Sequence, residues 1–182
     1  MTWSRRRVLE LGSAWAGVSA AGLWPGWARG GENSGRRIAL TNLHTDERLE
    51  VEYFRDGAYL PTALSAVEAV LRDFRTGERH PIDPALLDYL CDVARLLKVD
   101  PKFMVISGYR SPRTNARLHE QSAGVAQHSL HMQGRAIDVR VAGVDCATLA
   151  ARALDLMRGG VGYYRASDFV HLDTGAFRTW KG

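Results

Sequence analysis

Cysteine is scarce in this chain of 182 residues: only Cys91 and Cys146 occur, and there is no Cys-x-x-Cys pair. Neither a structural zinc site of the finger type nor a redox pair of that spacing is therefore indicated. Both cysteines fall in stretches with helical periodicity. We expect either two buried thiols or, in an oxidising compartment, a bond between them. Internal repeats and low-complexity tracts are also lacking.

A large excess of either charge is missing too. The sequence has 24 basic and 20 acidic residues, a formal net charge of +4. Residues 1–28 contribute Arg5, Arg6 and Arg7 against Glu10, so the chain without them has 21 basic and 19 acidic residues, a net charge of +2. This balance favours no particular polyanion, and the aromatic residues do not alternate with basic ones as in a groove for single-stranded nucleic acid. We expect no nucleic-acid partner.

A long hydrophobic run is the third absence. The apolar stretch Val8–Trp24 is shorter than the ~20 residues that a membrane-spanning helix needs, and no later segment is long enough. Residues 1–28 instead have the pattern of an export signal, a basic start followed by this apolar stretch. Within them SRRRVL resembles the twin-arginine pattern, although Glu10 stands where lysine is usual and valine where phenylalanine is usual. We expect twin-arginine export to the periplasm without a membrane anchor; a Sec signal or an uncleaved anchor is the alternative.

A Gly-rich linker at residues 29–35 then leads into a single domain at residues 36–182. Alternation with a period of two predicts strands, and apolar residues at helical spacing behind Pro61 and Pro84 predict two scaffold helices. The predicted strands are residues 36–44, 47–57, 103–106, 135–141, 161–164 and 169–174, and the predicted helices run from Pro61 to Gly77, from Pro84 to Leu97, behind the strand at 103–106, and from about Cys146 to Met157. We expect a monomeric α+β fold with a small, mostly antiparallel sheet and helices on one face.

Strand periodicity also predicts where two polar side chains point. In AIDVRV, Ile137 and Val139 share the apolar face, so Asp138 must point the other way. In FVHLD the same alternation turns His171 away from the apolar face. If these strands are neighbours, an imidazole and a carboxylate face one cleft.

A second imidazole, His131, precedes Asp138 by seven residues. Catalytic zinc prefers three nitrogen or oxygen ligands from the protein plus a water, and His131, Asp138 and His171 supply that set. Gly134 allows the chain to reverse between the first two. Each residue alone has an ordinary explanation as a solvated or capping side chain, whereas the combination predicts a zinc site.

Three segments carry a resemblance to a known family: ISGYRSPRTN, SLHMQGRAIDVRV and FVHLDTGAFRTW. They resemble the zinc peptidases of the D-Ala-D-Ala carboxypeptidase and lysostaphin type, and within that group the murein endopeptidase branch. The resemblance covers roughly residues 38–180. It implies one zinc ion held by His131, Asp138 and His171, and hydrolysis of peptide cross-links in peptidoglycan. It also gives Arg110 the role of stabilising the negative oxygen of the tetrahedral intermediate; binding of a substrate carboxylate is the other role for this arginine.

Two residues compete as general base. Related carboxypeptidases carry a glutamate three residues before the last zinc histidine, and this chain has the shorter Asp168 there. His128, three residues before His131, is the alternative that holds or deprotonates the water. Asp173 is expected to orient a ligand imidazole instead.

Three functions remain open: a murein endopeptidase, a trimming D,D- or L,D-carboxypeptidase, and a zinc-containing module that binds murein without cutting it. No long insertion that could roof a pocket lies between residues 141 and 168, which favours an open groove and hence the endopeptidase. Tyr109, Tyr163 and Tyr164 flank the site in sequence and are expected in this groove or in the core. The sequence leaves open whether the bond joins D-Ala to diaminopimelate or two diaminopimelates.

Overall fold

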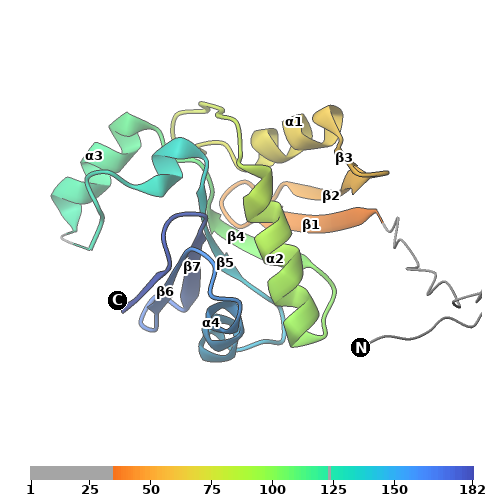
Figure 1. The fold of residues 1–182 in the computed structure, drawn as a ribbon. Helices are drawn as coiled ribbons and strands as arrows, with labels where there is room; N and C mark the ends of the chain where they lie inside the picture. The colour runs from red at the N-terminus through yellow and green to blue at the C-terminus, as the bar shows by residue number, and fades with distance from the viewer. Residues whose placement is uncertain (1–34, 123) are drawn as a thin grey trace, which may run out of the picture. The chain divides into compact units, whose positions relative to one another are not determined.

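The computed structural model describes residues 35–122 and 124–182, which fold around one sheet of eight strands (Figure 1). The predicted export signal and nearly all of the predicted linker lie outside the described residues. The strands are β1 Arg36–Asn42, β2 Arg48–Arg55, β3 Ala58–Tyr59, β4 Lys102–Ser107, β5 Ala136–Arg140, β6 Gly160–Tyr164, β7 Phe169–Asp173 and β8 Arg178–Lys181. The helices are α1 Pro61–Val70, α2 Pro84–Leu97, α3 Pro112–Gln121 and α4 Cys146–Asp155, with a short 3-10 helix, η1, at Leu130–Gln133.

The sheet is larger and more mixed than the sequence predicted. Its strands follow the order β3-β2-β1-β4-β5-β7-β6-β8. The α+β class is confirmed, but the prediction of a small, mostly antiparallel sheet is wrong, because β4 runs parallel to β1 and β8 runs parallel to β6. A parallel pair needs a long crossover, which α1 and α2 provide between the first hairpin and β4. The short edge strands β3 and β8 were not predicted at all.

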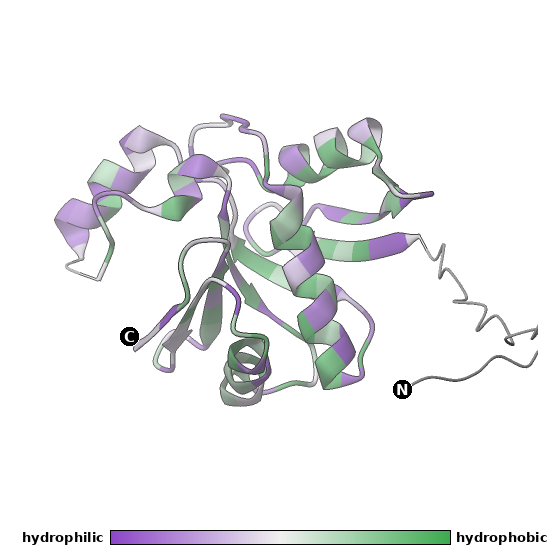
Figure 2. Cartoon of the chain, viewed as in Figure 1, coloured by the Kyte–Doolittle hydropathy of each residue, from purple (hydrophilic) through white to green (hydrophobic). Residues whose placement is uncertain are grey.

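Helices α1, α2 and α4 cover one face of the sheet and form the core with it. Asp83 caps α2 by accepting a hydrogen bond from the Ala85 N–H at 3.0 Å, with Pro84 in the first turn as predicted. The centre of the sheet is largely hydrophobic, whereas α3 is mostly hydrophilic and projects beyond the core (Figure 2). No helix in the described ranges is long and apolar enough to cross a membrane. Core side chains include Val67 of α1, Leu86, Leu90 and Val93 of α2, Leu149 and Ala153 of α4, and Ile38, Leu40, Ile137, Val139, Val170 and Leu172 of the strands.

Both cysteines are free thiols, and of the two buried thiols expected only Cys146 is fully buried. Cys91 is half-buried and lies 3.3 Å from the Tyr53 hydroxyl, whereas Cys146 is buried in the core. Burial raises the pKa of the Cys146 thiol to about 11, which keeps it protonated at neutral pH.

Helix α1 ends at Val70, well before the predicted stop at Gly77. The residues after Val70 instead form hydrogen bonds with the turn that follows β4. The Leu71 carbonyl accepts a hydrogen bond from the Tyr109 N–H at 2.7 Å, and the Asp73 carboxylate accepts two from Ser111, from its N–H at 2.9 Å and its hydroxyl at 2.6 Å. Asp73 is only 1% exposed. Burial alone would raise the pKa of Asp73, but the hydrogen bonds that it accepts outweigh burial and hold the pKa at about 2.

We expect Asp73→Asn to lower the free energy of unfolding at neutral pH by about 2 kcal/mol, because a charged, buried acceptor is lost. The folded-state pKa of Asp73 lies below its ordinary value, so its charge stabilises the fold fully above about pH 5 and less as the pH falls toward 2. Denaturant unfolding of chelator-treated protein between pH 3 and 7 should show the gap to wild type narrowing at low pH. The exposed pair Asp155–Arg152 provides the control: Asp155→Asn should change stability by less than about 0.5 kcal/mol. A gap that does not vary with pH would contradict the role of the Asp73 charge.

Candidate metal centre

Neighbouring strands β5 and β7 bring two of the predicted ligands together. Their register places Asp138 directly opposite His171. The adjacent residues Ile137 and Leu172 are in the core, so the prediction that Asp138 and His171 point to the other face is confirmed. His131 reaches the same point from η1, and all three side chains are buried.

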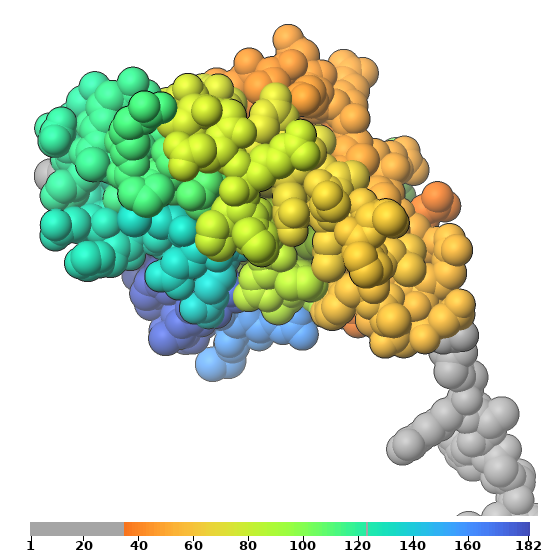
Figure 3. All heavy atoms as spheres, turned by 90° about the horizontal axis from the view of Figure 1, so that it is seen from above, coloured from red at the N-terminus to blue at the C-terminus, as the bar shows by residue number. Residues whose placement is uncertain are grey.

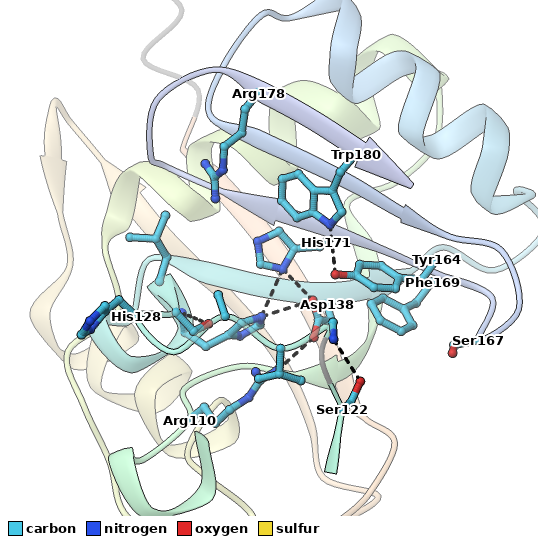
Figure 4. A pocket seen from close by; sticks show the side chains of 16 residues that line it. Arg110, Ser122, His128, Asp138, Tyr164, Ser167, Phe169, His171, Arg178 and Trp180 are labelled. Atoms are coloured by element: carbon cyan, nitrogen blue, oxygen red, sulfur yellow. Dashed lines mark hydrogen bonds and ion pairs between the residues drawn. The ribbon is translucent and has the colours of Figure 1, made fainter. Parts of the chain in front are cut away.

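Three atoms, which we call the donor triad, face one another: His131 Nε2, Asp138 Oδ1 and His171 Nδ1 (Figure 4). His131 Nε2 lies 3.2 Å from each of the other two, and His171 Nδ1 lies 2.8 Å from Asp138 Oδ1. Ligands at about 2.0–2.1 Å from a tetrahedral zinc ion lie about 3.3–3.4 Å from one another. The donor triad therefore has nearly the spacing of three corners of a zinc site, and these residues form a group that can hold a metal ion.

The other ring nitrogen of each histidine is held by an acceptor. His131 Nδ1 lies 2.7 Å from the Gly108 carbonyl oxygen, and His171 Nε2 lies 3.0 Å from Asp173 Oδ2. Both of these nitrogens must therefore carry hydrogen, which leaves a lone pair at His131 Nε2 and, in the neutral ring, at His171 Nδ1. Metal-binding histidines are oriented in this way. Asp173 thus has the orienting role predicted for it.

Burial and neighbouring charges set the protonation of the donor triad. Burial lowers the pKa of His131. Burial also lowers the pKa of His171, but hydrogen bonds to Asp138 and Asp173 outweigh it and raise that pKa to about 9. For Asp138, burial raises the pKa, and the two histidines outweigh burial and hold it far below its usual range. The metal-free triad thus keeps one proton, whereas a divalent cation satisfies all three donors at once. The donor set fits zinc.

Arg110 lies beside the donor triad, in the turn that follows β4. Its Nη2 is 3.5 Å from Asp138 Oδ2 and 3.4 Å from the Ser107 hydroxyl. Its Nε is buried and has no hydrogen-bond partner within the described residues. The Arg110 N–H donates to the His131 carbonyl at 3.2 Å. The guanidinium therefore lies at the site and lines the groove, where either of its two predicted roles would place it.

The turn that carries Arg110 is seated on the segment after α1. A Cβ atom at Gly108 would lie 2.6 Å from the Leu71 carbonyl oxygen, so only glycine permits this close approach. The next residue, Tyr109, is buried in the core and does not line the groove. Tyr163 is also absent from the groove lining, whereas Tyr164 belongs to it.

The donor triad lies in a groove of about 450 Å³ (Figure 4). His128 lines this groove and is exposed at its rim. Asp168 is not among the lining residues; its side chain is 69% exposed and lies 3.6 Å from Arg140 Nε. Of the two candidate bases, the structure thus brings only His128 to the groove. The lining comprises Arg110, Ser122, Gly124, Val125, Ala126, His128, Ser129, Leu130, His131, Asp138, Tyr164, Ser167, Phe169, His171, Arg178 and Trp180.

Comparison with known proteins agrees with this geometry. A family model described as peptidoglycan L,D-endopeptidase MepK matches residues 31–180. The chain belongs to the MepK family. The chain is 37% identical over 177 residues to the peptidoglycan L,D-endopeptidase MepK of Escherichia coli K12, with 97% of each chain covered. It is 41% identical over 148 residues to the probable peptidoglycan L,D-endopeptidase MepK of Haemophilus influenzae, with 81% of this chain and 80% of that protein covered. No solved structure matches the chain significantly.

One wall of the groove in this MepK-family chain is aromatic, and the sequence predicted only Tyr164 of it. Trp180 Nε1 donates to the Tyr164 hydroxyl at 3.0 Å, and the Tyr164 ring stacks on Phe169 with centroids 4.5 Å apart. The Trp180 ring lies 5.2 Å from the His171 ring. Gly162 makes room for it, because a Cβ there would lie 2.5 Å from the indole. Trp180 reaches this wall because β8 pairs in parallel with β6. A four-residue edge strand carries no sequence pattern that would predict this pairing.

Asp173 accepts more hydrogen bonds than any other carboxylate described at the site. Besides His171, it accepts from the N–H groups of Gly160 at 2.9 Å and Gly175 at 2.8 Å, and from Arg178 at 2.6 and 3.0 Å. Burial alone would raise the pKa of Asp173, but the hydrogen bonds from His171 and Arg178 outweigh burial and keep it well below the usual range. The carboxylate is therefore charged and fixed where it orients His171.

We expect Asp173→Asn to weaken zinc binding by about 10- to 100-fold, because the amide removes the charge that orients the His171 ring. Competition with a chromophoric chelator measures this affinity. Asp92 provides a matched control, since it is also buried and paired with two arginines, Arg95 and Arg158, but does not line the groove. Asp92→Asn should retain wild-type zinc affinity. Unchanged affinity in Asp173→Asn would show that His171 needs no charged acceptor.

Proposed function

We propose that this chain is a zinc-dependent L,D-endopeptidase that cuts peptide cross-links of peptidoglycan in the periplasm. The observation that carries the proposal is the donor triad, with each imidazole oriented by an acceptor, in a groove beside Arg110. Membership of the MepK family supports the peptidoglycan endopeptidase activity. Residues 1–28 are proposed as a twin-arginine signal and residues 36–182 as a monomeric peptidase domain.

The stereochemistry named for the relatives selects one of the two cross-links. An L,D bond joins the carboxyl group of an L-centre to the amine of a D-centre, which describes the link between two diaminopimelates. The link from D-Ala to diaminopimelate joins two D-centres instead. Because the matched relatives are named L,D-endopeptidases, we propose the bond between two diaminopimelates as the substrate.

The residues of the groove divide the reaction between them. When bound by His131, Asp138 and His171, zinc supplies a Lewis acid that activates a water and polarises the scissile carbonyl. Arg110 stabilises the negative charge that develops on the carbonyl oxygen, because its guanidinium lines the groove beside the donor triad. The electrostatic part of catalysis thus comes from groups already in place before substrate binds.

The shape of the groove favours an endopeptidase over a trimming carboxypeptidase. Exposed residues lie around the groove: in Figure 4 His128 is at the left and Ser167 at the right of the side chains drawn, with Arg178 above and Ser122 below. A chain that continues in both directions past the cut bond needs such an open groove, whereas a carboxypeptidase benefits from an enclosed pocket.

His128 is the proposed proton carrier. It lines the groove, whereas the carboxylate of Asp168 is turned toward Arg140. An imidazole that lines the groove can accept a proton from the water and return it to the leaving amine.

We expect the processed protein to split dimers linked through two diaminopimelates and to leave dimers linked through D-Ala intact. A chelator should abolish cleavage and added zinc should restore it, with His171→Ala as an inactive control. Chromatography and mass spectrometry of defined muropeptides measure the products. Release of terminal D-Ala from monomers would instead identify a carboxypeptidase, and binding to murein without any product would identify a binding module.

We expect His128→Gln to lower kcat by a factor of about 10² or more with zinc retained, because the proton carrier is lost. Asp168→Asn should stay within about threefold of wild type, since its side chain lies outside the groove. Steady-state kinetics on the cross-linked dimer, with metal analysis of each variant, decide between them. The reverse result would assign the base to Asp168, and near-normal turnover in both variants would rule out a dedicated base at either residue.

A further inference from the structure

Three arginines surround a second hollow outside the groove. Arg75 belongs to the segment after α1, and Arg113 and Arg117 belong to the first two turns of α3. With Thr76 and Thr114 they line a hollow of about 300 Å³. Seen from above, the yellow-green segment that follows α1 lies beside the green residues of α3 (Figure 3), and the hollow is lined by residues of both segments.

These arginines lack counter-charges. None of the three forms an ion pair within the described residues, although most other described arginines do. Asp73 lies near Arg75, but it is buried, and its oxygens accept hydrogen bonds from Ser111 and from the Arg75 N–H. The cluster therefore presents uncompensated positive charge to an outside anion.

Arg75 is held in place within the cluster by its contacts with Phe74 and Asp73. The Arg75 guanidinium lies 4.1 Å from the centre of the Phe74 ring, and its backbone N–H is held by Asp73 at 3.0 Å. Burial lowers the pKa of Arg75, and the positive charges of Arg117 and Arg110 lower it further, against the opposing effect of Asp73. These guanidinium groups repel one another, and an anion bound between them would relieve that repulsion.

We propose that Arg75, Arg113 and Arg117 bind a free carboxylate of a peptidoglycan stem peptide away from the bond being cut. The proposal rests on the proposed peptidoglycan substrate, because that polymer carries many stem peptides with free carboxylates. Arginine is suited to this ligand, since its planar fork binds both carboxylate oxygens. The cluster is close in the chain to the catalytic groove: Arg113 follows Arg110 by three residues. A second stem peptide held there keeps the enzyme on the polymer and raises the local concentration of cross-links at the groove.

The test measures binding to purified murein sacculi by co-sedimentation, in the His171→Ala background so that the sacculi stay intact. We expect the triple variant Arg75→Gln, Arg113→Gln, Arg117→Gln to bind about tenfold more weakly or worse than its parent, because charge-assisted hydrogen bonds are lost. Binding equal to that of the parent would overturn the proposal.

A second triple variant controls for net charge. Arg37→Gln, Arg48→Gln and Lys98→Gln remove the same charge from exposed side chains that form no ion pair within the described ranges. This control should bind within about twofold of the parent. An equal loss in the control would mean that general charge attraction, and no defined site, holds the polymer.

Sacculi whose carboxylates have been converted to amides identify the ligand. The parent should bind them as weakly as the arginine-cluster variant binds untreated sacculi. Strong binding to amidated sacculi that still depends on the three arginines would assign the site to another anion. Because binding is measured without catalysis, a wild type that fails to cut muropeptide dimers would overturn the proposed function and leave this result intact.

Discussion

Two imidazole nitrogens and a carboxylate oxygen face one another at 3.2 Å or less, an arrangement that a shared proton or a cation between them stabilises. Each imidazole ring is kept in this orientation by a hydrogen bond from its other ring nitrogen. The Gly108 carbonyl holds His131, and Asp173 holds His171. Asp173 in turn needs the N–H groups of Gly160 and Gly175 and the Arg178 guanidinium to remain charged at zero exposure.

The same requirement explains why the turn after β4 is fixed so firmly. That turn supplies both the carbonyl that orients His131 and the Arg110 side chain, so a shift in it would move two parts of the site together. Leu71 and Asp73 contact the turn from the other side, and both residues lie in the part of the predicted helix that is not helical in the structure, because α1 ends at Val70. The helical preference of residues 71–76 is thus outweighed by hydrogen bonds to the turn that carries Arg110.

The sequence revealed those parts of the site that depend on local periodicity. Alternation in β5 and β7 was enough to place Asp138 and His171 on the same face, because side chains in a strand alternate whatever the rest of the fold does. The pairing of strands that are distant in sequence could not be predicted from this periodicity. The parallel strand β8, and with it Trp180, depends on a contact with β6 that four residues of edge strand do not encode in their pattern. Likewise, Asp168 stands at the expected position in sequence, yet its side chain is turned toward Arg140.

The net charge of the chain does not predict whether its surface binds an anionic polymer, because most of the described arginines are paired with acidic residues. What matters for an anionic polymer is where charge is left unpaired. Within the described residues, three arginines without an ion pair lie together at one hollow beside the start of α3. The groove itself has an aromatic wall, formed by Trp180, Tyr164 and Phe169. A stem peptide has carboxylates on some residues and methyl or methylene groups on others, so its apolar parts suit the aromatic wall of the groove and its carboxylates suit the arginines in the hollow outside it.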